Sequence, residues 1–299
     1  MIELRRERKR NRPMTILEVI QRSTDFLAKK GVPSPRLQVE HLLAHTLQMP
    51  RMKLYLNFER ELTPPQLEAL RCMVQRRGRR EPIQYITGSA AFCGLEMSVN
   101  KNVLAPRPET ELLAERAWKF LQECAAHHAA PAGLDLGTGS GCLAIALAVH
   151  APGAAIHACD VSGEALAVAR QNAARHGVRV EFYQGDLFAA VPPGARFQLI
   201  VSNPPYIPTE RLKELEPEVR DYEPRQALDG GADGLDFYRR IAAEGGGFLE
   251  PAGRLMAELD EDGAEAAAEL FRRQNWIVEA IEPDYSQRPR IMIARRASV

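Results

Sequence analysis

Four consecutive residues in the second half of the chain, Asn203-Pro204-Pro205-Tyr206, combine an amide, a rigid backbone and an aromatic ring. Each proline fixes its own φ near −65°, and Pro204 also restricts Asn203 to an extended conformation. The Asn203 side-chain oxygen and the Pro204 carbonyl can then each accept one hydrogen bond from a substrate NH2 group, while Tyr206 packs against it. The structural alternative for this tetrapeptide is a rigid turn that packs a tyrosine.

A glycine-rich segment lies upstream, where an apolar run ending at Leu136 is followed by Gly137-Thr138-Gly139-Ser140-Gly141. Residues 142–150 then have helical character. A strand, a glycine loop and a helix in this order form the first turn of a Rossmann-like unit, where the backbone approaches a ligand closely. Cys142 stands where a dinucleotide fingerprint needs glycine, and no P-loop lysine follows. The loop therefore favours a nucleoside ligand over a pyrophosphate.

Three further polar positions each follow a strand-like run. Asp160 ends the run 155–159, about 20 residues beyond the loop, where a carboxylate would bind ribose hydroxyls. Asp186-Leu187 follow the run 180–183 and would bind an adenine amino group and cover its face. Asn203 ends the run 197–202. Each of these residues alone is more often structural, but parallel strands would place all of them at one sheet edge, so together they predict a nucleoside-cofactor site.

Length and composition predict a two-domain chain from a reducing compartment. The 299 residues are 45% hydrophobic, which is enough for a full core and for two domains. The apolar runs are too short to span a membrane, and the basic N-terminus has no apolar stretch behind it that would make a signal peptide. The five cysteines occur singly, which argues against a disulfide framework or a zinc site and indicates a cytoplasmic protein.

Charge is distributed unevenly, although the whole chain is neutral. Residues 1–80 hold 18 Lys+Arg and 8 Asp+Glu, net +10, and the remainder holds 21 and 31, net −10. This difference suggests an anionic partner for the first part, either nucleic acid or an acidic protein. Residues 1–13 are expected to be a solvated basic arm, either disordered or in contact with nucleic acid. The arginines of segment 76–80 are either a solvated helix end or a contact for an acidic partner.

The chain divides into four predicted parts. After the arm 1–13, residues 14–80 predict a small helical bundle, with helix starts at Thr15, Ser34-Pro35 and Thr63-Pro64. Residues 81–104 are short and β-prone around 83–86 and 92–99, which predicts a hairpin that links the domains. The segment 106–111 opens a helix with acidic residues in its first turn, where the helix dipole favours them. Residues 105–299 are expected to form the catalytic domain.

Several motifs, taken in order, resemble the HemK/PrmC release-factor glutamine methyltransferases. They are Glu81-Pro82-Ile83-Gln84-Tyr85-Ile86 with Gly88, Pro106-Arg107-Pro108-Glu109-Thr110-Glu111, the glycine loop with Asp135, Asn203-Pro204-Pro205-Tyr206-Ile207, and Tyr222-Glu223-Pro224-Arg225-Gln226-Ala227-Leu228 with Gly234-Leu235. The resemblance implies an α/β class I S-adenosylmethionine (SAM) fold with seven strands, the last one antiparallel near 290–295. It also implies SAM as cofactor, no metal, and N5-methylation of the glutamine in the Gly-Gly-Gln motif of bacterial peptide chain release factors.

The chain departs from this family pattern at a few positions away from the expected reacting centre. Ala105 stands in place of the usual isoleucine, Cys93 in place of tyrosine, and Glu258-Leu259-Asp260 in place of Glu-Ile-Gly. These departures leave the expected reaction in place and make local packing harder to predict.

The expected chemistry is positioning, because the lone pair of an amide nitrogen is delocalised and a poor nucleophile. Asn203 and Pro204 would orient the NH2 group within about 3–3.5 Å of the sulfonium methyl. No His, Asp or Glu adjoins the tetrapeptide in the sequence, so we expect no dedicated base. Three alternatives remain at this level: methylation of a ribosomal-protein glutamine, methylation of adenine N6 or cytosine N4 in DNA, and a catalytically silent binding module on the ribosome.

Overall fold

The computed structural model describes residues 14–297, which form two compact units. The first, here called the helical unit, comprises the chain up to Gly88 together with Pro217–Tyr222. The second, the sheet unit, comprises Ser89–Glu216 and the chain from Glu223 onward. The chain therefore returns to the helical unit for six residues after it has begun the sheet unit. The predicted basic arm 1–13 lies outside the described residues.

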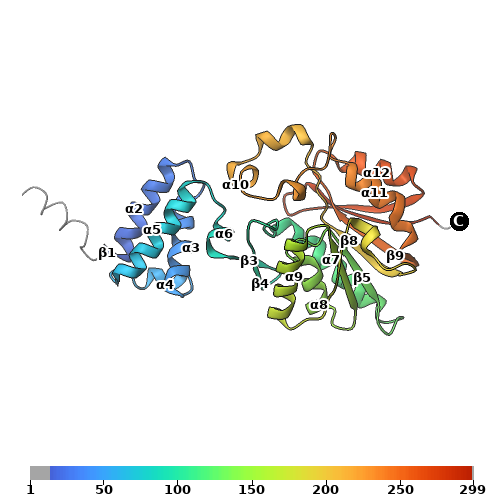
Figure 1. Cartoon of the computed structure of the whole chain (residues 1–299), viewed down its shortest axis with the longest axis horizontal. Coiled ribbons are helices and arrows are strands. Elements are labelled where there is room, and N and C mark those ends of the chain that lie inside the picture. The colour runs from blue at the N-terminus through green and yellow to red at the C-terminus, as the bar shows by residue number, and fades with distance from the viewer. Residues whose placement is uncertain (1–13, 298–299) are drawn as a thin grey trace, which may run out of the picture. The chain divides into compact units, whose positions relative to one another are not determined.

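In the helical unit the helices α2, α3 and α5 form a bundle (Figure 1). Its elements are β1 (Met14–Thr15), α2 (Ile16–Lys29), α3 (Pro35–Leu47), α4 (Met52–Tyr55), β2 (Glu61–Leu62), α5 (Pro64–Gly78), α6 (Ile83–Thr87) and α10 (Pro217–Arg220). Thr15 forms a capping box with Glu18, as the sequence predicts. Ser34 has the left-handed conformation and makes no cap hydrogen bond, so α3 begins at Pro35 without a side-chain cap.

One predicted strand is wrong. Residues 83–87 form helix α6, because Pro82 starts the turn and Gly88, at φ +76°, ends it, while Tyr85 and Ile86 are buried. The hairpin is shorter than predicted and pairs β3 (Ser89–Phe92) with β4 (Leu95–Ser98). Its two-residue turn, Cys93-Gly94, has positive φ at both positions, as a type I′ turn requires.

Three of the four arginines of segment 76–80 make ion pairs inside the helical unit, which neither expectation foresaw, whereas Arg79 is exposed. Arg76 pairs with Glu81 at 2.5 Å, and the buried Arg77 donates to Glu218 of α10 at 2.7 Å. Arg80 pairs with the other Glu218 oxygen at 2.5 Å. Burial opposes ionisation of Glu218, but the two arginines outweigh it and lower its pKa. Pairs of this kind hold residues 217–222 on the bundle.

The sheet unit contains a seven-stranded sheet in the order β10-β11-β9-β8-β5-β6-β7. The strands are β5 (Ala132–Leu136), β6 (Ala155–Asp160), β7 (Glu181–Gln184), β8 (Phe197–Ser202), β9 (Leu249–Glu258), β10 (Trp276–Pro283) and β11 (Pro289–Arg296). The strands from β9 to β7 are parallel, and β11 is antiparallel to both its neighbours. The predicted class I methyltransferase topology and its antiparallel last strand are confirmed.

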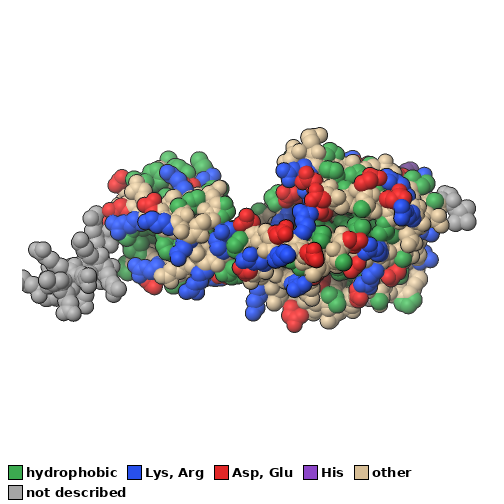
Figure 2. All heavy atoms as spheres, turned by 90° about the horizontal axis from the view of Figure 1, so that it is seen from above, with side chains coloured by type: hydrophobic (Ala, Val, Ile, Leu, Met, Phe, Trp, Pro, Cys, Tyr) green, Lys and Arg blue, Asp and Glu red, His purple; other side chains and the backbone are tan. Residues whose placement is uncertain are grey.

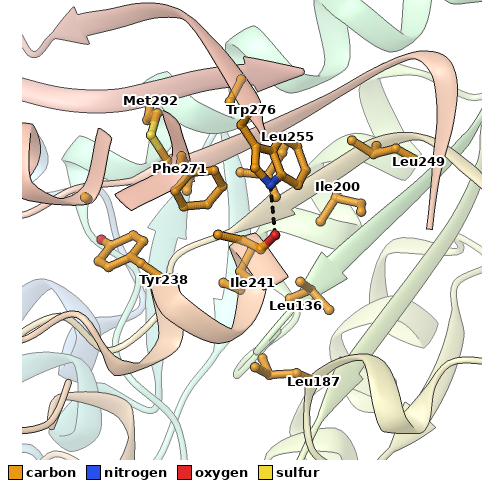
Figure 3. Close-up of a cluster of buried hydrophobic side chains, with 14 of the residues drawn as sticks. Leu136, Leu187, Ile200, Tyr238, Ile241, Leu249, Leu255, Phe271, Trp276 and Met292 are labelled. Atoms are coloured by element: carbon orange, nitrogen blue, oxygen red, sulfur yellow. Dashed lines mark hydrogen bonds between the residues drawn. The ribbon is translucent and has the colours of Figure 1, made fainter. Parts of the chain in front are cut away.

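Helices cover both faces of this sheet, because successive strand residues point to opposite sides. Leu199 and Val201 of β8 pack into the core under α7 (Pro108–Cys124), α8 (Cys142–His150) and α9 (Gly163–His176). Ile200 packs into the opposite core, under α11 (Asp236–Glu244) and α12 (Ala264–Arg273). Figure 3 shows this second core, where the Trp276 indole donates to the Ala242 carbonyl at 2.9 Å. Short 3-10 turns complete the unit at Leu187–Ala190, Thr209–Glu214, Arg225–Ala227 and Gly245–Gly247.

Charge is mixed on the surface of both units. On the face in Figure 2, basic and acidic side chains are interspersed. The described part of the helical unit, residues 14–88 and 217–222, holds 13 Lys+Arg and 9 Asp+Glu, net +4. The +10 of the first 80 residues is therefore partly carried by residues 1–13 and partly offset by acids such as Glu218. No helix among residues 14–297 is both long and apolar enough to cross a membrane.

Candidate active site

A cavity of about 310 Å³ opens at the carboxyl ends of β5, β6, β7 and β8 in the sheet unit. The sheet order reverses between β5 and β8, which is where open α/β sheets bind ligands. The cavity is lined by Asn102, Val103, Leu104, Gly137, Gly139, Cys159, Asp160, Val161, Ala165, Gly185, Asp186, Leu187, Asn203, Pro205, Pro224, Gln226, Ala227, Phe237 and Arg240. The four strand-end positions that the sequence predicted to meet, Gly139, Asp160, Asp186 and Asn203, are all in its lining.

Two glycines of the loop line the cavity, and the third packs against a helix. Gly137 and Gly139 line the cavity with φ of +71° and +55°, and a Cβ at either would meet no described atom within 4 Å. Gly141 is absent from the described lining, and its Cβ would lie 3.0 Å from the Cβ of Ala169. This third glycine therefore permits close packing of α8 on α9.

Thr138 and Ser140 are buried and do not belong to the described lining of the cavity. The Thr138 hydroxyl donates to the Asp135 carboxylate at 2.6 Å. The Ser140 carbonyl accepts from the Asn172 side chain, which also donates to the Ser98 carbonyl of β4. These two loop residues hold the backbone of the loop in place.

Asp160 holds the same loop from the neighbouring strand. One carboxylate oxygen accepts from the Gly139 backbone N–H at 2.8 Å, and the other accepts from Ser162 at 2.9 Å. Each oxygen keeps a second lone pair for a hydroxyl in the cavity. Asp186 has less acceptor capacity left for a ligand, because the guanidinium of Arg240 pairs with one of its oxygens at 2.9 Å. Leu187 lines the cavity with φ of +49°, a strained conformation for a residue with a side chain.

The Asn-Pro-Pro-Tyr segment leaves β8 as an irregular loop. Asn203 and Pro205 line the cavity, whereas Pro204 is buried and, with Tyr206, is outside the described lining. The Tyr206 hydroxyl donates to Glu258 at 3.2 Å. A carboxylate therefore contacts the tetrapeptide in space, although none adjoins it in the sequence, because Glu258 arrives from the end of β9.

Backbone from residues 228–234 fastens this loop from behind. The Ile207 N–H donates to the Leu228 carbonyl at 3.0 Å, and the Gly230 N–H donates to the Ile207 carbonyl at 2.9 Å. A Cβ at Gly234, which has φ of +78°, would lie 2.3 Å from the Tyr206 carbonyl oxygen. Only glycine fits so close to the loop, which explains the Asp-Gly-Gly-Ala-Asp-Gly run at 229–234.

Sequence reasoning missed several residues that line or support the cavity. The Arg107 guanidinium pairs with the buried Glu223 carboxylate at 2.5 Å, which ties the Pro-Arg-Pro segment to the cavity wall at Pro224. Phe237 and Arg240 come from α11, far along the chain from the strand ends. Arg107 and Glu223 belong to the motifs at 106–111 and 222–228, which could have pointed to them. No local sequence pattern distinguishes Phe237 or Arg240.

Asp135 was also not predicted as a site residue, and its environment is unusual. It is fully buried in β5, with one carboxyl oxygen bonded to Thr138 and the Ala144 N–H, and the other without a partner among the described residues. Burial raises the pKa of the Asp135 carboxyl to about 7, although those hydrogen bonds act to lower it. Asp135 is absent from the described lining of the cavity, and a buried acceptor without a partner costs the folded protein free energy.

The raised pKa of Asp135 predicts that the free energy of unfolding of the ligand-free protein depends on pH. The folded state keeps this proton up to about pH 7, whereas the unfolded chain loses it near pH 4, so the free energy of unfolding falls as pH rises between them. Asp135→Asn cannot ionise. We expect the variant to gain on the order of 2–3 kcal/mol relative to wild type between about pH 5 and about pH 8, measured by urea unfolding.

Asp25→Asn is the matched control, because the Asp25 side chain is exposed in the helical unit. It should show no such gain. A stability difference between Asp135→Asn and wild type that does not change with pH would show that Asp135 does not titrate in this range.

Among residues 14–297, no three His, Cys, Asp or Glu side chains lie close enough together to hold a metal ion. The cavity instead offers a glycine loop, carboxylates on neighbouring strands and an amide at the end of β8. This set of groups can bind a nucleoside with a positive charge and hold a second molecule that carries hydrogen-bond donors.

Comparison with known proteins agrees with this arrangement. The model of the PrmC N-terminal domain matches residues 18–88, and that of the methyltransferase small domain matches residues 114–215. The Release factor glutamine methyltransferase of Geobacter sulfurreducens is 49% identical over 259 residues, which are 87% of this chain and 89% of that protein. The protein of the same description from Deinococcus radiodurans is 38% identical over 284 residues, 95% of this chain and 99% of that protein.

Solved structures support the fold. A methyltransferase from Pyrococcus furiosus superposes with a TM-score of 0.50 over 75% of this chain and 99% of that one, at 18% sequence identity. At this level of identity the likeness concerns the architecture alone.

Proposed function

The chain belongs to the release factor glutamine methyltransferase family, and we propose that it methylates the N5 side-chain amide of the glutamine in the Gly-Gly-Gln motif of peptide chain release factors. One observation carries this proposal. Asn203, in a rigid loop, lines the same cavity as Gly137, Gly139 and Asp160 of the neighbouring strands. An amide-orienting side chain thus shares a cavity with the loop that would bind the cofactor.

The residues present fit S-adenosylmethionine. Asp160 retains acceptor capacity for the ribose hydroxyls, and Asp186 with Leu187 lies at the end of β7 for the adenine. When bound, S-adenosylmethionine supplies an electrophilic methyl group on a sulfonium.

Asn203 and Pro204 provide the catalytic contribution of the chain. The Asn203 side-chain oxygen and the Pro204 carbonyl would each accept one N–H of the substrate amide, which holds its nitrogen in line with the methyl group. These bonds strengthen as positive charge develops on nitrogen, so they stabilise the transition state more than the ground state. Once the amide nitrogen has taken the methyl group that the sulfonium would supply, it would release its proton to solvent. Pro205 and Tyr206 would pack against the substrate.

Glu258 is unsuited to be the base for that proton. Its side chain is 1% exposed, and its two oxygens already accept from Thr110 and Tyr206. It is connected to Asn203 through the Thr110 hydroxyl. Its role is taken up below.

A direct test is to offer the protein a panel of acceptors with isotope-labelled S-adenosylmethionine. Intact release factor, a ribosomal protein with an exposed glutamine and double-stranded DNA would be compared at equal concentration. Label in the release factor that disappears when its Gly-Gly-Gln glutamine is replaced by alanine would support the proposal. Label in DNA or in the ribosomal protein, with none in the release factor, would contradict it.

We assign recognition of the folded substrate to residues 14–80, the link to 81–104 and catalysis to 105–299, all in the cytoplasm. A Gly-Gly-Gln loop alone offers less than the roughly 800 Å² per partner of a specific interface. Segment 76–80 cannot supply the rest through Arg76, Arg77 and Arg80, since all three are paired internally. The helical unit does expose apolar side chains around α4, where Met52 is 66% and Leu56 84% accessible.

The double variant Met52→Ser, Leu56→Ser should therefore lower kcat/KM for the intact release factor about tenfold, as expected for loss of about 1.4 kcal/mol of contact energy. It should leave kcat/KM for a short Gly-Gly-Gln peptide unchanged, because the cavity of the sheet unit is intact. Steady-state methyl transfer to both substrates gives the comparison.

Tyr285→Ser provides the matched control, since Tyr285 is 85% exposed on the sheet unit. It should alter neither value. An equal loss with the peptide and the intact factor would show that α4 does not contribute to substrate selection.

A further inference from the structure

A chain of hydrogen bonds runs from a buried carboxylate to the amide of Asn203. Asn203 Nδ2 donates to Thr110 Oγ1 at 3.1 Å, and Thr110 Oγ1 donates to Glu258 Oε2 at 2.6 Å. Thr110, in the first turn of α7, is 3% exposed, and Glu258, the last residue of β9, is 1% exposed. Three separate elements therefore meet behind the cavity. Thr110 belongs to a segment that the sequence suggested was an ordinary helix start.

Which atom donates in each of these hydrogen bonds follows from the number of protons that each side chain carries. An ionised carboxylate only accepts, so it takes the single proton of the Thr110 hydroxyl. The Thr110 oxygen then has only lone pairs left for Asn203, and the only donor in that side chain is Nδ2. The side-chain oxygen of Asn203, Oδ1, must therefore point away from Thr110. Glu258 also accepts the Tyr206 hydroxyl proton, so it fixes both ends of the tetrapeptide.

We propose that Thr110 and Glu258 are positioning residues that set the orientation of the Asn203 amide, so that its oxygen faces the substrate. The inference rests on the function proposed above. With Asn203 Oδ1 and the Pro204 carbonyl both presented as acceptors, the site accepts a group that carries two N–H donors. A glutamine side chain satisfies that requirement, whereas a glutamate carboxylate would meet two acceptors with no proton to share. The hydrogen-bonded series Glu258–Thr110–Asn203, here called the relay, would thus also make the site select a glutamine amide over a glutamate carboxylate.

Electrostatics are compatible with this role. Burial is the largest influence and leaves the pKa of Glu258 raised, and the hydrogen bonds from Thr110 and Tyr206 and the positive charge of Arg290 oppose this rise. Arg290 donates to the Leu259 carbonyl and pairs with Asp284 at 3.4 Å, which holds it beside Glu258. A positive charge near a buried carboxylate limits the cost of keeping it ionised.

Thr110→Val, which replaces the hydroxyl by a methyl of similar size, tests the relay. We expect kcat for the release factor to fall about 10- to 100-fold, with the Kd for S-adenosylmethionine within about twofold of wild type. Thr110→Ser keeps the hydroxyl and should recover most of kcat. In an Asn203→Ala background, Thr110→Val should cause no further loss, because its effect passes through Asn203. Glu258→Gln, which can donate as well as accept, should also lower kcat.

Tyr238→Phe is the matched control for loss of a buried hydrogen bond at the same place. The Tyr238 hydroxyl donates to the backbone carbonyl of Glu258 at 2.6 Å and takes no part in the side-chain relay. This variant should lower the melting temperature and leave kcat unchanged. If kcat fell in Tyr238→Phe as much as in Thr110→Val, the role of Thr110 would be structural only. The same conclusion would follow if Thr110→Val lowered kcat by its full factor in the Asn203→Ala background.

A second readout separates this inference from the proposed function. The Asn203 side-chain NH2 resonances, assigned by their loss in Asn203→Ala, should shift in Thr110→Val and stay near their wild-type positions in Thr110→Ser. If wild type methylated no release factor, the proposed function would fail while these resonances still reported on the relay. Unchanged Asn203 resonances in a folded Thr110→Val protein would overturn the relay, whatever the substrate. If Thr110→Val does not fold, wild-type kcat in Glu258→Gln would overturn it instead.

Discussion

Asn203→Asp is expected to lower kcat roughly a hundred- to a thousandfold, the loss typical of removing one oriented polar group from a transition-state site. The substituted carboxylate has nearly the same shape but no N–H to donate to Thr110 Oγ1. Thr110 has one proton, and Glu258 already accepts it, so two carboxylates would compete for it. The carboxylate would still offer an acceptor oxygen to the substrate amide, but its negative charge beside the sulfonium would favour the ground state, and the competition for the Thr110 proton would disturb its orientation.

Methyl transfer to intact release factor at saturating S-adenosylmethionine gives this kcat. The melting temperature should change little, because Pro204, Pro205 and the backbone bonds from Leu228 to Gly230 hold the loop without help from the Asn203 side chain. Asn203→Ala should lose kcat to a similar extent. Turnover of Asn203→Asp at the wild-type rate would mean that amide orientation by this residue is not the basis of the reaction.

Asp160→Ala is expected to weaken S-adenosylmethionine binding about ten- to a hundredfold, since hydrogen bonds to a charged group are worth roughly 1.5–3 kcal/mol. Two effects combine in this loss. The variant removes the acceptors proposed for the ribose, and it also leaves the N–H groups of Gly139 and Ser162 without their carboxylate. The loop would then lose its fixed conformation before any ligand arrives. Calorimetric titration of the folded variant measures the affinity.

Asp160→Asn distinguishes the two effects, because it keeps one acceptor oxygen and the size of the side chain. Its affinity should lie between those of wild type and Asp160→Ala, and kcat at saturating cofactor should stay close to wild type in both variants. A folded Asp160→Ala protein that binds S-adenosylmethionine as tightly as wild type would exclude Asp160 from the site.

The sequence determined the architecture and the cofactor side of the site because that information is local. An apolar run followed by glycines that must have positive φ specifies a strand, a turn and a helix, and it does so at Gly137 and Gly139 whatever surrounds them. Parallel strands then bring Asp160, Asp186 and Asn203 to one edge by topology alone. Proline geometry likewise makes the loop at 203–206 rigid without reference to the rest of the fold.

Tertiary structure decided what surrounds those positions, because partners far apart in the chain meet only after folding. Residues 83–87 have β-prone side chains, yet Pro82, Gly88 and burial of Tyr85 and Ile86 make them a helix. Arg77 looked like a surface charge until Glu218, 141 residues later, folded back onto it. Thr110 and Glu258 lie 148 residues apart, and neither suggests alone that one proton between them fixes the amide of Asn203. Local pattern therefore specified the scaffold and the reactive loop, and long-range hydrogen bonding specified how that loop is oriented.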